Sequence, residues 1–164
     1  MDVALAREVA ASVLDPELPV LTLADLGVLR NVAADADSIV VTITPTYTGC
    51  PAMETMRADL VASLNAAGFE RVRVRTELSP AWTTDWISED GRRKLVEYGI
   101  APPSPVGRRS GPVPLALSPP VSHVRCPRCG SADTEELSRF GATACKALRR
   151  CLACAEPFEH IKEL

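Results

Sequence analysis

This sequence has few aromatic residues, few histidines and no excess of basic residues. Aromatic residues make up 4% of its 164 residues, and it contains two histidines. Its formal net charge is −3 and its pI is about 5.4. Domains that bind nucleic acid through its phosphates are commonly basic. The charge therefore argues against that class and leaves only a local basic patch open.

Long apolar segments are also missing. The apolar runs are only a few residues long, whereas a helix that spans a bilayer needs about 20. The N-terminus places an acidic residue before any basic one and has no apolar region of the kind found in signal peptides. We therefore expect a cytoplasmic protein that contacts neither membrane nor nucleic acid. Its six cysteines should stay reduced and act as metal ligands or reactive groups.

Proline and cysteine divide the chain. Seven of the 14 prolines fall between Pro102 and Pro120, and five of the six cysteines follow them. A proline-rich segment resists helix and central strand and favours an extended linker. We therefore expect a folded domain over residues 1–100, a linker over 101–122 and a small cysteine-rich module over 123–164.

The first region has the pattern of a small α/β domain. Helices are predicted over residues 3–14, 51–67 and 88–98, and strands over 28–32, 39–44 and 72–75. In the first helix, Leu5, Val9 and Val13 recur four apart and predict the buried face. Of the two tryptophans, we expect one of Trp82 and Trp86 in the core and leave the other open as a partner anchor. The fold expected is a small mixed sheet with helices packed on one face.

Four cysteines in the last region have the spacing of a metal site. Cys126 and Cys129 form one C-x2-C pair, and Cys151 and Cys154 form another 21 residues later. Two such pairs offer four soft sulfur ligands at tetrahedral corners, which suits zinc. The set leaves no open coordination position, so we expect a structural zinc ribbon, with a rubredoxin-like iron site as the alternative. Ala155 follows the second pair where a glycine follows the first, which predicts a less regular second turn.

Cys145 lies between the two pairs and has two interpretations. It is either a reactive thiol assisted by the neighbouring Lys146 or a small buried hydrophobic residue.

Cys50 stands directly before the helix predicted over residues 51–67. Pro51 suits the first helical position, because its missing N–H would be unpaired there. Cys50 then lies at or beside the N-cap, where free amides and the helix dipole should lower its pKa. Such a thiol could bind metal or sulfur, or it could merely fill space. Residues 1–100 contain no histidine, which argues against a hydrolase based on Cys50.

Polar residues accompany this cysteine in the loops. Asp15 and Glu17 follow the first predicted helix, Asp25 precedes the first predicted strand, and Thr46 lies in the loop before Cys50. Carboxylates in turns commonly cap helices or stay solvated. Taken together with Cys50, these residues could form a mixed oxygen and sulfur pocket at one end of the sheet.

The motifs of the first region resemble those of the SufT-like metal–sulfur cluster biosynthesis family. They are Asp15-Pro16-Glu17, Asp25-Leu26-Gly27 and the segment Thr44 to Pro51. The later segments, from Pro80 to Ile87, from Tyr98 to Pro103 and from Cys126 to Phe158, resemble the PaaD family of the bacterial phenylacetyl-CoA epoxidase system.

This resemblance implies a maturation factor for the epoxidase, whose partners are a di-iron oxygenase and a reductase with flavin and a [2Fe–2S] cluster. The resemblance assigns the transfer of iron or an iron–sulfur cluster to Cys50, Asp25 and, less directly, Asp15 and Glu17, and we add Thr46. It assigns the structural metal to the four ribbon cysteines. The sequence has no phosphate loop, NAD fingerprint or Glu-x-x-His motif, so we do not expect an enzyme.

Two other functions stay open. One is a non-catalytic structural or interaction subunit of the oxygenase complex, and the other is a nucleic-acid-binding ribbon. The nearly balanced charge of residues 123–164 argues against the latter. A homodimer that shares a metal through Cys50 is a further alternative.

Overall fold

The computed structural model describes residues 2–47, 49–106 and 124–163. The chain divides into two compact units, Met1–Leu95 and Val96–Leu164. The linker predicted over 101–122 lies outside the described residues from position 107 onward. None of the described helices has the length and apolar character needed to cross a bilayer.

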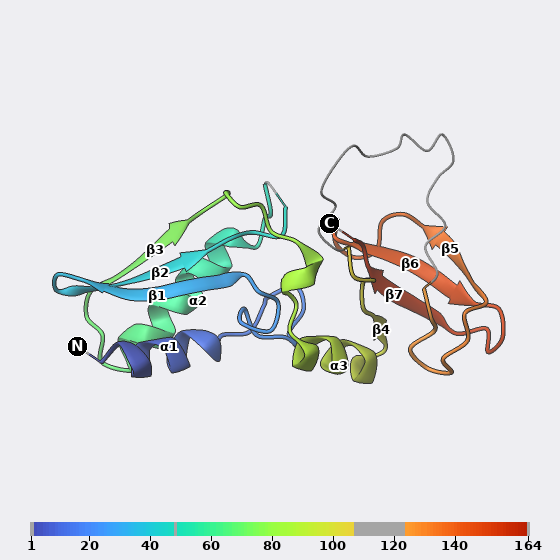
Figure 1. Cartoon of the computed structure of the whole chain (residues 1–164), viewed down its shortest axis with the longest axis horizontal. Helices are drawn as coiled ribbons and strands as arrows, with labels where there is room; N and C mark the ends of the chain where they lie inside the picture. The colour runs from blue at the N-terminus through green and yellow to red at the C-terminus, as the bar shows by residue number, and fades with distance from the viewer. Residues whose placement is uncertain (1, 48, 107–123, 164) are drawn as a thin grey trace. The chain divides into compact units, whose positions relative to one another are not determined.

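The first unit is a three-stranded sheet with helices (Figure 1). Its elements are α1 (Val3–Ala11), β1 (Leu29–Asp35), β2 (Ser38–Ile43), α2 (Met53–Ala66), β3 (Val72–Thr76), a 3-10 turn η1 (Thr84–Trp86) and α3 (Glu89–Tyr98), which runs past Leu95. The strand order is β1-β2-β3. β1 and β2 form an antiparallel hairpin, whereas β2 and β3 are parallel, with α2 in the crossover that a parallel pair requires.

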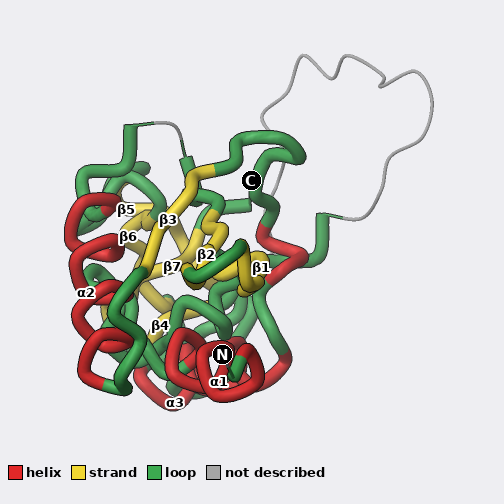
Figure 2. The backbone as a smooth tube through the Cα atoms, turned by 90° about the vertical axis from the view of Figure 1, so that its left-hand side faces the viewer, coloured by secondary structure: helices red, strands yellow, loops and turns green. Residues whose placement is uncertain are grey.

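Strand β2 is the centre of this unit, and all six of its residues are buried. Ile39, Val41 and Ile43, predicted to share one face, are completely inaccessible to solvent. Helix α1 packs on β1 and α2, and α2 packs on β3. Figures 1 and 2 show both helices on the same side of the sheet, which confirms the predicted fold class.

The first helix is shorter than predicted and buries a different face. It ends at Ala11, and its buried residues are Ala6 and Ala10, whereas Leu5 is 43% exposed. Two alanines on one stripe bring the helix backbone close to its neighbours. Of the predicted stripe, Val13 is buried but lies beyond the end of the helix, whereas Leu5 is exposed and Val9 is partly exposed. Beyond the helix, Leu14 pairs with Thr22 in an isolated bridge, which turns the chain away from helical geometry.

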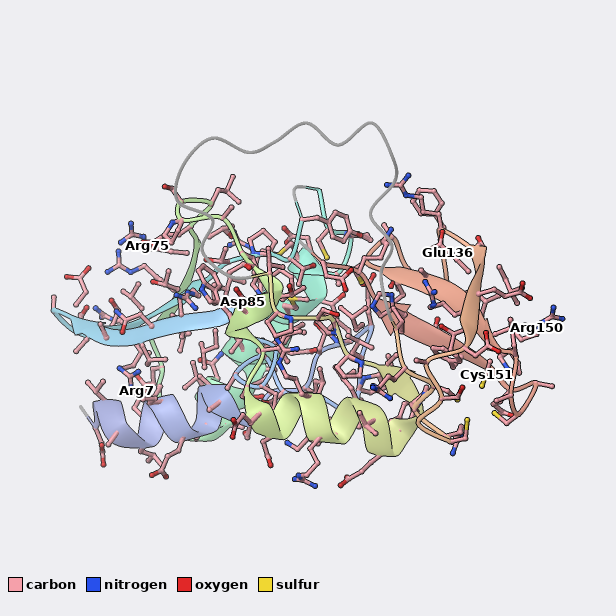
Figure 3. All side chains as sticks on the ribbon, turned by 45° about the vertical axis from the view of Figure 1, so that its right-hand side comes forward. Arg7, Arg75, Asp85, Glu136, Arg150 and Cys151 are labelled. Atoms are coloured by element: carbon pink, nitrogen blue, oxygen red, sulfur yellow. The ribbon has the colours of Figure 1, made fainter. Side chains whose placement is uncertain are left out.

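Arginines from the two helices cover both free edges of this sheet. Arg7 of α1 donates to the carbonyl of Val32 on β1 at 3.0 Å, and Arg57 of α2 donates to that of Val74 on β3 at 3.0 Å. Arg7 is labelled in Figure 3. Exposed strand edges invite pairing with other chains, so these two side chains help to keep the sheet at three strands.

The second unit is a four-stranded sheet. Its strands are β4 (Ile100–Ala101), β5 (Thr134–Ser138), β6 (Lys146–Cys151) and β7 (Pro157–Ile161), in the order β4-β7-β6-β5. Strand β4 is parallel to β7 and the other pairs are antiparallel. A small buried cluster consists of Ala101, Val124, Cys126, Cys151 and Phe158. Two of these five residues are predicted metal ligands, so this core includes part of the metal site.

Candidate metal and sulfur sites

The four ribbon cysteines lie together at one end of the second sheet. Their sulfur atoms are all within 4.8 Å of one another. The distance is 3.8 Å between the sulfurs of Cys126 and Cys154 and 3.5 Å between those of Cys129 and Cys151. A tetrahedron with zinc–sulfur bonds of about 2.3 Å has edges of about 3.8 Å. The donor set and its spacing therefore fit one zinc ion; Figure 3 labels Cys151 in this group.

The two turns that carry these cysteines have the same backbone geometry. Gly130 follows the first pair with φ 74°, and Ala155 follows the second with φ 62°. The second turn is thus as regular as the first, contrary to the prediction, although alanine pays a steric penalty in this left-handed conformation. The pKa of Cys151 falls to about 7, because backbone N–H groups of Cys154 and then Ala153 donate to its sulfur. Backbone amides therefore favour the thiolate that a metal needs.

Cys145 is buried, and Lys146, which was one candidate to assist its thiol, pairs with a different residue. Its sulfur lies 3.1 Å from the hydroxyl oxygen of Thr143. The ammonium of Lys146 instead pairs with Glu159 at 2.8 Å. This placement favours the interpretation of Cys145 as a small packed residue.

Cys50 lies in the loop between β2 and α2 and is 6% exposed. Helix α2 begins at Met53, with Ala52 as its N-cap, so Cys50 precedes the N-cap by two residues instead of occupying it. The backbone N–H of Cys50 donates to the carbonyl of Tyr47 at 3.3 Å, which folds the loop into a turn. The backbone N–H of Ala52 donates to the Cys50 sulfur, as expected of an amide near a helix start.

The pKa of the Cys50 thiol is raised, whereas the sequence predicted a lowered one. Burial is the main cause, because it disfavours the charged thiolate. Donation from Ala52 and from the Tyr47 side chain acts in the opposite direction, and the charges of Glu17 and Asp15 raise the pKa further. The prediction considered only the effect of the helix start on the thiol. It did not include the two carboxylates or the loss of hydration on burial.

A hollow of 350 Å³ is lined in part by Cys50. It is lined by Pro45, Gly49, Cys50, Met53, Glu54, Arg57, Thr76 and Leu78. The Arg57 guanidinium is fixed there by donation to the Thr76 hydroxyl as well as to the β3 edge. Thr46 does not line this hollow but an adjacent one of 80 Å³, together with Tyr47 and Trp82. Sequence reasoning missed Arg57, although it lies one helical turn after Met53 and thus on the same face.

The predicted acidic residues separate into two groups. Asp15 is 3% exposed and accepts from the backbone N–H groups of Glu17 and Leu18 at 2.9 and 2.7 Å. The charges of Glu17 and Asp15 act on the Cys50 thiol, but neither residue is among those that line the hollow beside it.

Asp25 has a different set of partners. Its carboxylate accepts from the ammonium of Lys94 at 2.7 Å and from the backbone N–H of Thr22 at 3.0 Å. Burial alone would raise the pKa of Asp25, but the hydrogen bonds from Lys94 and Thr22 outweigh it and hold the pKa below its usual value. Asp25 is thus placed to anchor α3 through Lys94. No sequence pattern could have revealed this pair, whose members are 69 positions apart.

The tryptophan segment packs on the loop that contains Asp25. Trp82 is buried and donates from its indole nitrogen to the carbonyl of Leu26 at 2.9 Å. The ring of Trp86 is partly exposed and lies 3.5 Å from the Arg30 guanidinium. A Cβ atom at Gly27 would lie 2.6 Å from that of Trp86, so only glycine fits there. One tryptophan is in the core, as predicted.

Comparison with known proteins accounts for both units. Residues 111–162 match the family described as "PaaD zinc beta ribbon domain", and residues 7–75 match "Iron-sulfur cluster assembly protein". The chain is 49% identical over 148 residues to an Escherichia coli K12 protein described as a subunit of a "Putative 1,2-phenylacetyl-CoA epoxidase", covering 90% of this chain and 85% of that one. The chain belongs to the PaaD family.

In this PaaD family member, the two sulfur sites lie in different matched regions. Cys50, Asp15 and Glu17 lie in the iron–sulfur assembly region, and the four clustered cysteines lie in the zinc ribbon region. A crystal structure of a domain of unknown function, DUF59, from Bacillus anthracis matches 57% of this chain and 90% of its own, with 26% identity and a TM-score of 0.52. Part of this chain's fold is thus found in another protein.

Proposed function

We propose that this protein delivers iron or an iron–sulfur cluster to the phenylacetyl-CoA epoxidase complex of aerobic phenylacetate catabolism. Cys50 is the carrier thiol, and the zinc ribbon is structural. The protein performs no catalysis of its own and acts in the cytoplasm, where thiols stay reduced. The recipients are the oxygenase and reductase components of that complex.

The observation that carries this proposal is the combination of a cysteine beside a hollow with two carboxylates whose charges act on its thiol. Cys50 is one of the residues that line the hollow, and Glu17 and Asp15 act on it electrostatically. Iron accepts both thiolate and carboxylate ligands. The match of residues 7–75 to an iron–sulfur assembly family supports the same assignment.

The raised pKa of Cys50 is compatible with a carrier that keeps its thiol protonated until it binds iron. Without metal, the buried thiol keeps its proton and is a poor nucleophile, which protects it from oxidation. A bound cation would displace the proton, because metals bind the thiolate. The same carboxylates that disfavour a bare thiolate attract that cation. Few ligands from one chain also favour release to a recipient that offers more.

A second function, that of a structural subunit of the epoxidase complex, is favoured by the ribbon. Its four-sulfur site is closed, and closed sites support folding and docking but no transfer. Under this alternative, Cys50 is a packing residue, and its replacement by serine would leave assembly and activity unchanged.

Replacement of Cys50 in cells tests the proposal. In a strain that lacks this protein and therefore lacks epoxidase activity, we expect Cys50→Ser to fail to restore iron to the oxygenase or the [2Fe–2S] cluster to the reductase. Cys145→Ser, which alters another buried thiol, is the matched control and should restore both. The readout is iron and sulfide content of the purified components. Full loading with Cys50→Ser would support the structural alternative instead.

A further inference from the structure

An exposed aromatic side chain stands in the loop between β5 and β6. Phe140 is 64% exposed, although large aromatic residues are usually buried to a high degree. The chain contains only three phenylalanines, and Phe158, in the same unit, lies in the core. Such an exposure in a small unit with little core calls for a physical explanation.

The loop that carries Phe140 is attached to β7 by an ion pair whose lysine is buried and whose glutamate is partly exposed. Lys146 is almost fully buried and pairs with Glu159 at 2.8 Å. The other carboxylate oxygen of Glu159 accepts from the backbone N–H of Ala142 at 3.3 Å. Burying two charges is costly unless both are well paired. Here the pair fastens the loop to β7.

Hydrogen bonds between neighbouring residues also hold the loop in place. The Ser138 hydroxyl donates to the carbonyl of Phe140 at 2.8 Å and accepts from its backbone N–H at 3.2 Å. The N–H of Gly141 donates to the carbonyl of Lys146 at 2.7 Å. A Cβ atom at Gly141 would lie 3.2 Å from the Glu159 carboxylate, so the loop packs closely there. The exposure of Phe140 therefore belongs to an ordered loop.

One cation lies over the ring, and a second belongs to the residue that precedes it in the sequence. The ammonium of Lys162 lies 4.6 Å from the centre of the Phe140 ring and donates to the carbonyl of Arg139 at 3.2 Å. Within the described part of the chain, neither Arg139 nor Lys162 forms an ion pair. By contrast, the three cationic residues of β6 pair with Glu135, Glu136 and Glu159. An aromatic group with two unneutralised cations is complementary to an apolar pocket bordered by carboxylates.

We propose that Phe140, Arg139 and Lys162 form a docking anchor for a protein partner whose surface offers an apolar pocket with acidic residues at its rim. Interface hot spots are commonly aromatic or arginine residues, and rim charges guide association. A nucleic acid is disfavoured, because Lys162 covers one face of the ring and glutamates line the adjacent strand. The anchor does not depend on transfer by Cys50.

Binding of the full zinc-loaded chain to the purified oxygenase and reductase components tests this proposal. We expect Phe140→Ala to weaken binding to one of them roughly 10- to 100-fold. Leu5→Ala, at an exposed apolar residue of α1, is the control and should change the Kd less than about twofold. Arg139→Glu with Lys162→Glu should slow association and remove its salt dependence. Zinc content and thermal midpoint check that each variant is folded.

Three outcomes would overturn the anchor: no binding of the native chain to either component, equal Kd values for native protein and Phe140→Ala, or loss of dimerisation of this chain as the sole effect. Binding of single-stranded RNA that depends on Phe140 and falls steeply with salt would assign the surface to nucleic acid instead. Cys50→Ser should bind its partner normally, so failure of the transfer proposal and failure of the anchor can be told apart.

Discussion

The two units of this protein arrange their cysteines differently. In the second, four sulfurs converge within 4.8 Å and complete a tetrahedral set without help from another molecule. In the first, buried Cys50 is one of the residues that line a hollow, and the charges of Asp15 and Glu17 act on its thiol. A complete ligand set retains its metal, whereas an incomplete one allows exchange. Under the proposed function, the number of ligands that the chain supplies separates the structural site from the transfer site.

The units also differ in what holds them together. The first has a fully buried central strand with helices α1 and α2 on one face. The second has a cluster of five buried residues, two of which, Cys126 and Cys151, are also metal ligands. A core of this size cannot stabilise a fold alone, and a bound metal supplies the missing free energy. Metal loss should therefore unfold one unit and spare the other.

The largest effect that this comparison predicts follows from Cys126→Ser. It should abolish zinc binding and unfold the second unit, since structural zinc contributes on the order of 10 kcal/mol. Elemental analysis would show zinc falling from one per chain to none. Amide NMR signals of residues 2–95 should remain dispersed. Their collapse along with the ribbon would contradict the independence of the units.

Asp25→Ala should damage the first unit and leave the ribbon intact. It removes the partner of Lys94 and the acceptor for the Thr22 backbone, and we expect a loss of about 2 kcal/mol in the free energy of unfolding. Asp90→Ala removes an exposed partner of the same lysine and should cost clearly less. Urea titrations of both variants check the difference; equal losses would show that Asp25 is no anchor.

The pH dependence of this anchor has a definite sign. The pKa of Asp25 is lower in the folded protein than its ordinary value. Its stabilising contribution is therefore fully present above the unfolded pKa of about 3.9 and disappears as the pH falls through the lower folded value. The Asp25→Ala penalty should shrink in acid, and a penalty that grows below pH 4 would be inconsistent with the pair.

Thiol alkylation sharpens the contrast between the sulfur sites. In the zinc-loaded Cys145→Ser background, iodoacetamide should modify Cys50 about tenfold more slowly at pH 7.5 than an exposed thiol, because its pKa is raised. Glu17→Gln should lower that pKa, and Tyr47→Phe, which removes a donor to the thiolate, should raise it. Rate profiles from pH 6 to 10 give the values. Opposite shifts would contradict the assigned contacts.

Two alanines with positive φ predict the smallest effect. Ala36, in the β1–β2 turn, and Ala155, in the second cysteine turn, have φ values of 51° and 62°. Glycine at either position should stabilise its own unit by about 1 kcal/mol. Ala58→Gly, in the middle of α2, is the control and should destabilise by a similar amount. Differential scanning calorimetry distinguishes the signs.

The sequence predicted those features that depend on spacing along the chain. The strands β1 and β2 and the helices α2 and α3 all appear near their predicted places, and the Ser88 hydroxyl accepts from the N–H of Gly91 at the start of α3. The four ribbon cysteines converge for the same reason, since two short C-x2-C turns each fix a pair. Local repetition and short turns determine these features.

Features that depend on contacts between distant segments could not be predicted in the same way. The face of α1 is set by alanines that allow close approach, and Lys94 reaches Asp25 across the unit. The pKa of Cys50 rises because burial and two carboxylates from distant parts of the sequence outweigh the donors of Ala52 and Tyr47. The sequence shows that amide donors are present near a helix start, but only the tertiary structure shows that the Cys50 thiol is removed from water.

Metal content after anaerobic reconstitution with iron and sulfide tests the division of labour between the two sulfur sites most directly. Native protein and Cys50→Ser are passed through gel filtration, and zinc and iron are measured in each. We expect one zinc per chain in both proteins and bound iron only in the native one. Equal iron in the two proteins, or loss of zinc from Cys50→Ser, would contradict a transfer thiol that works independently of the ribbon.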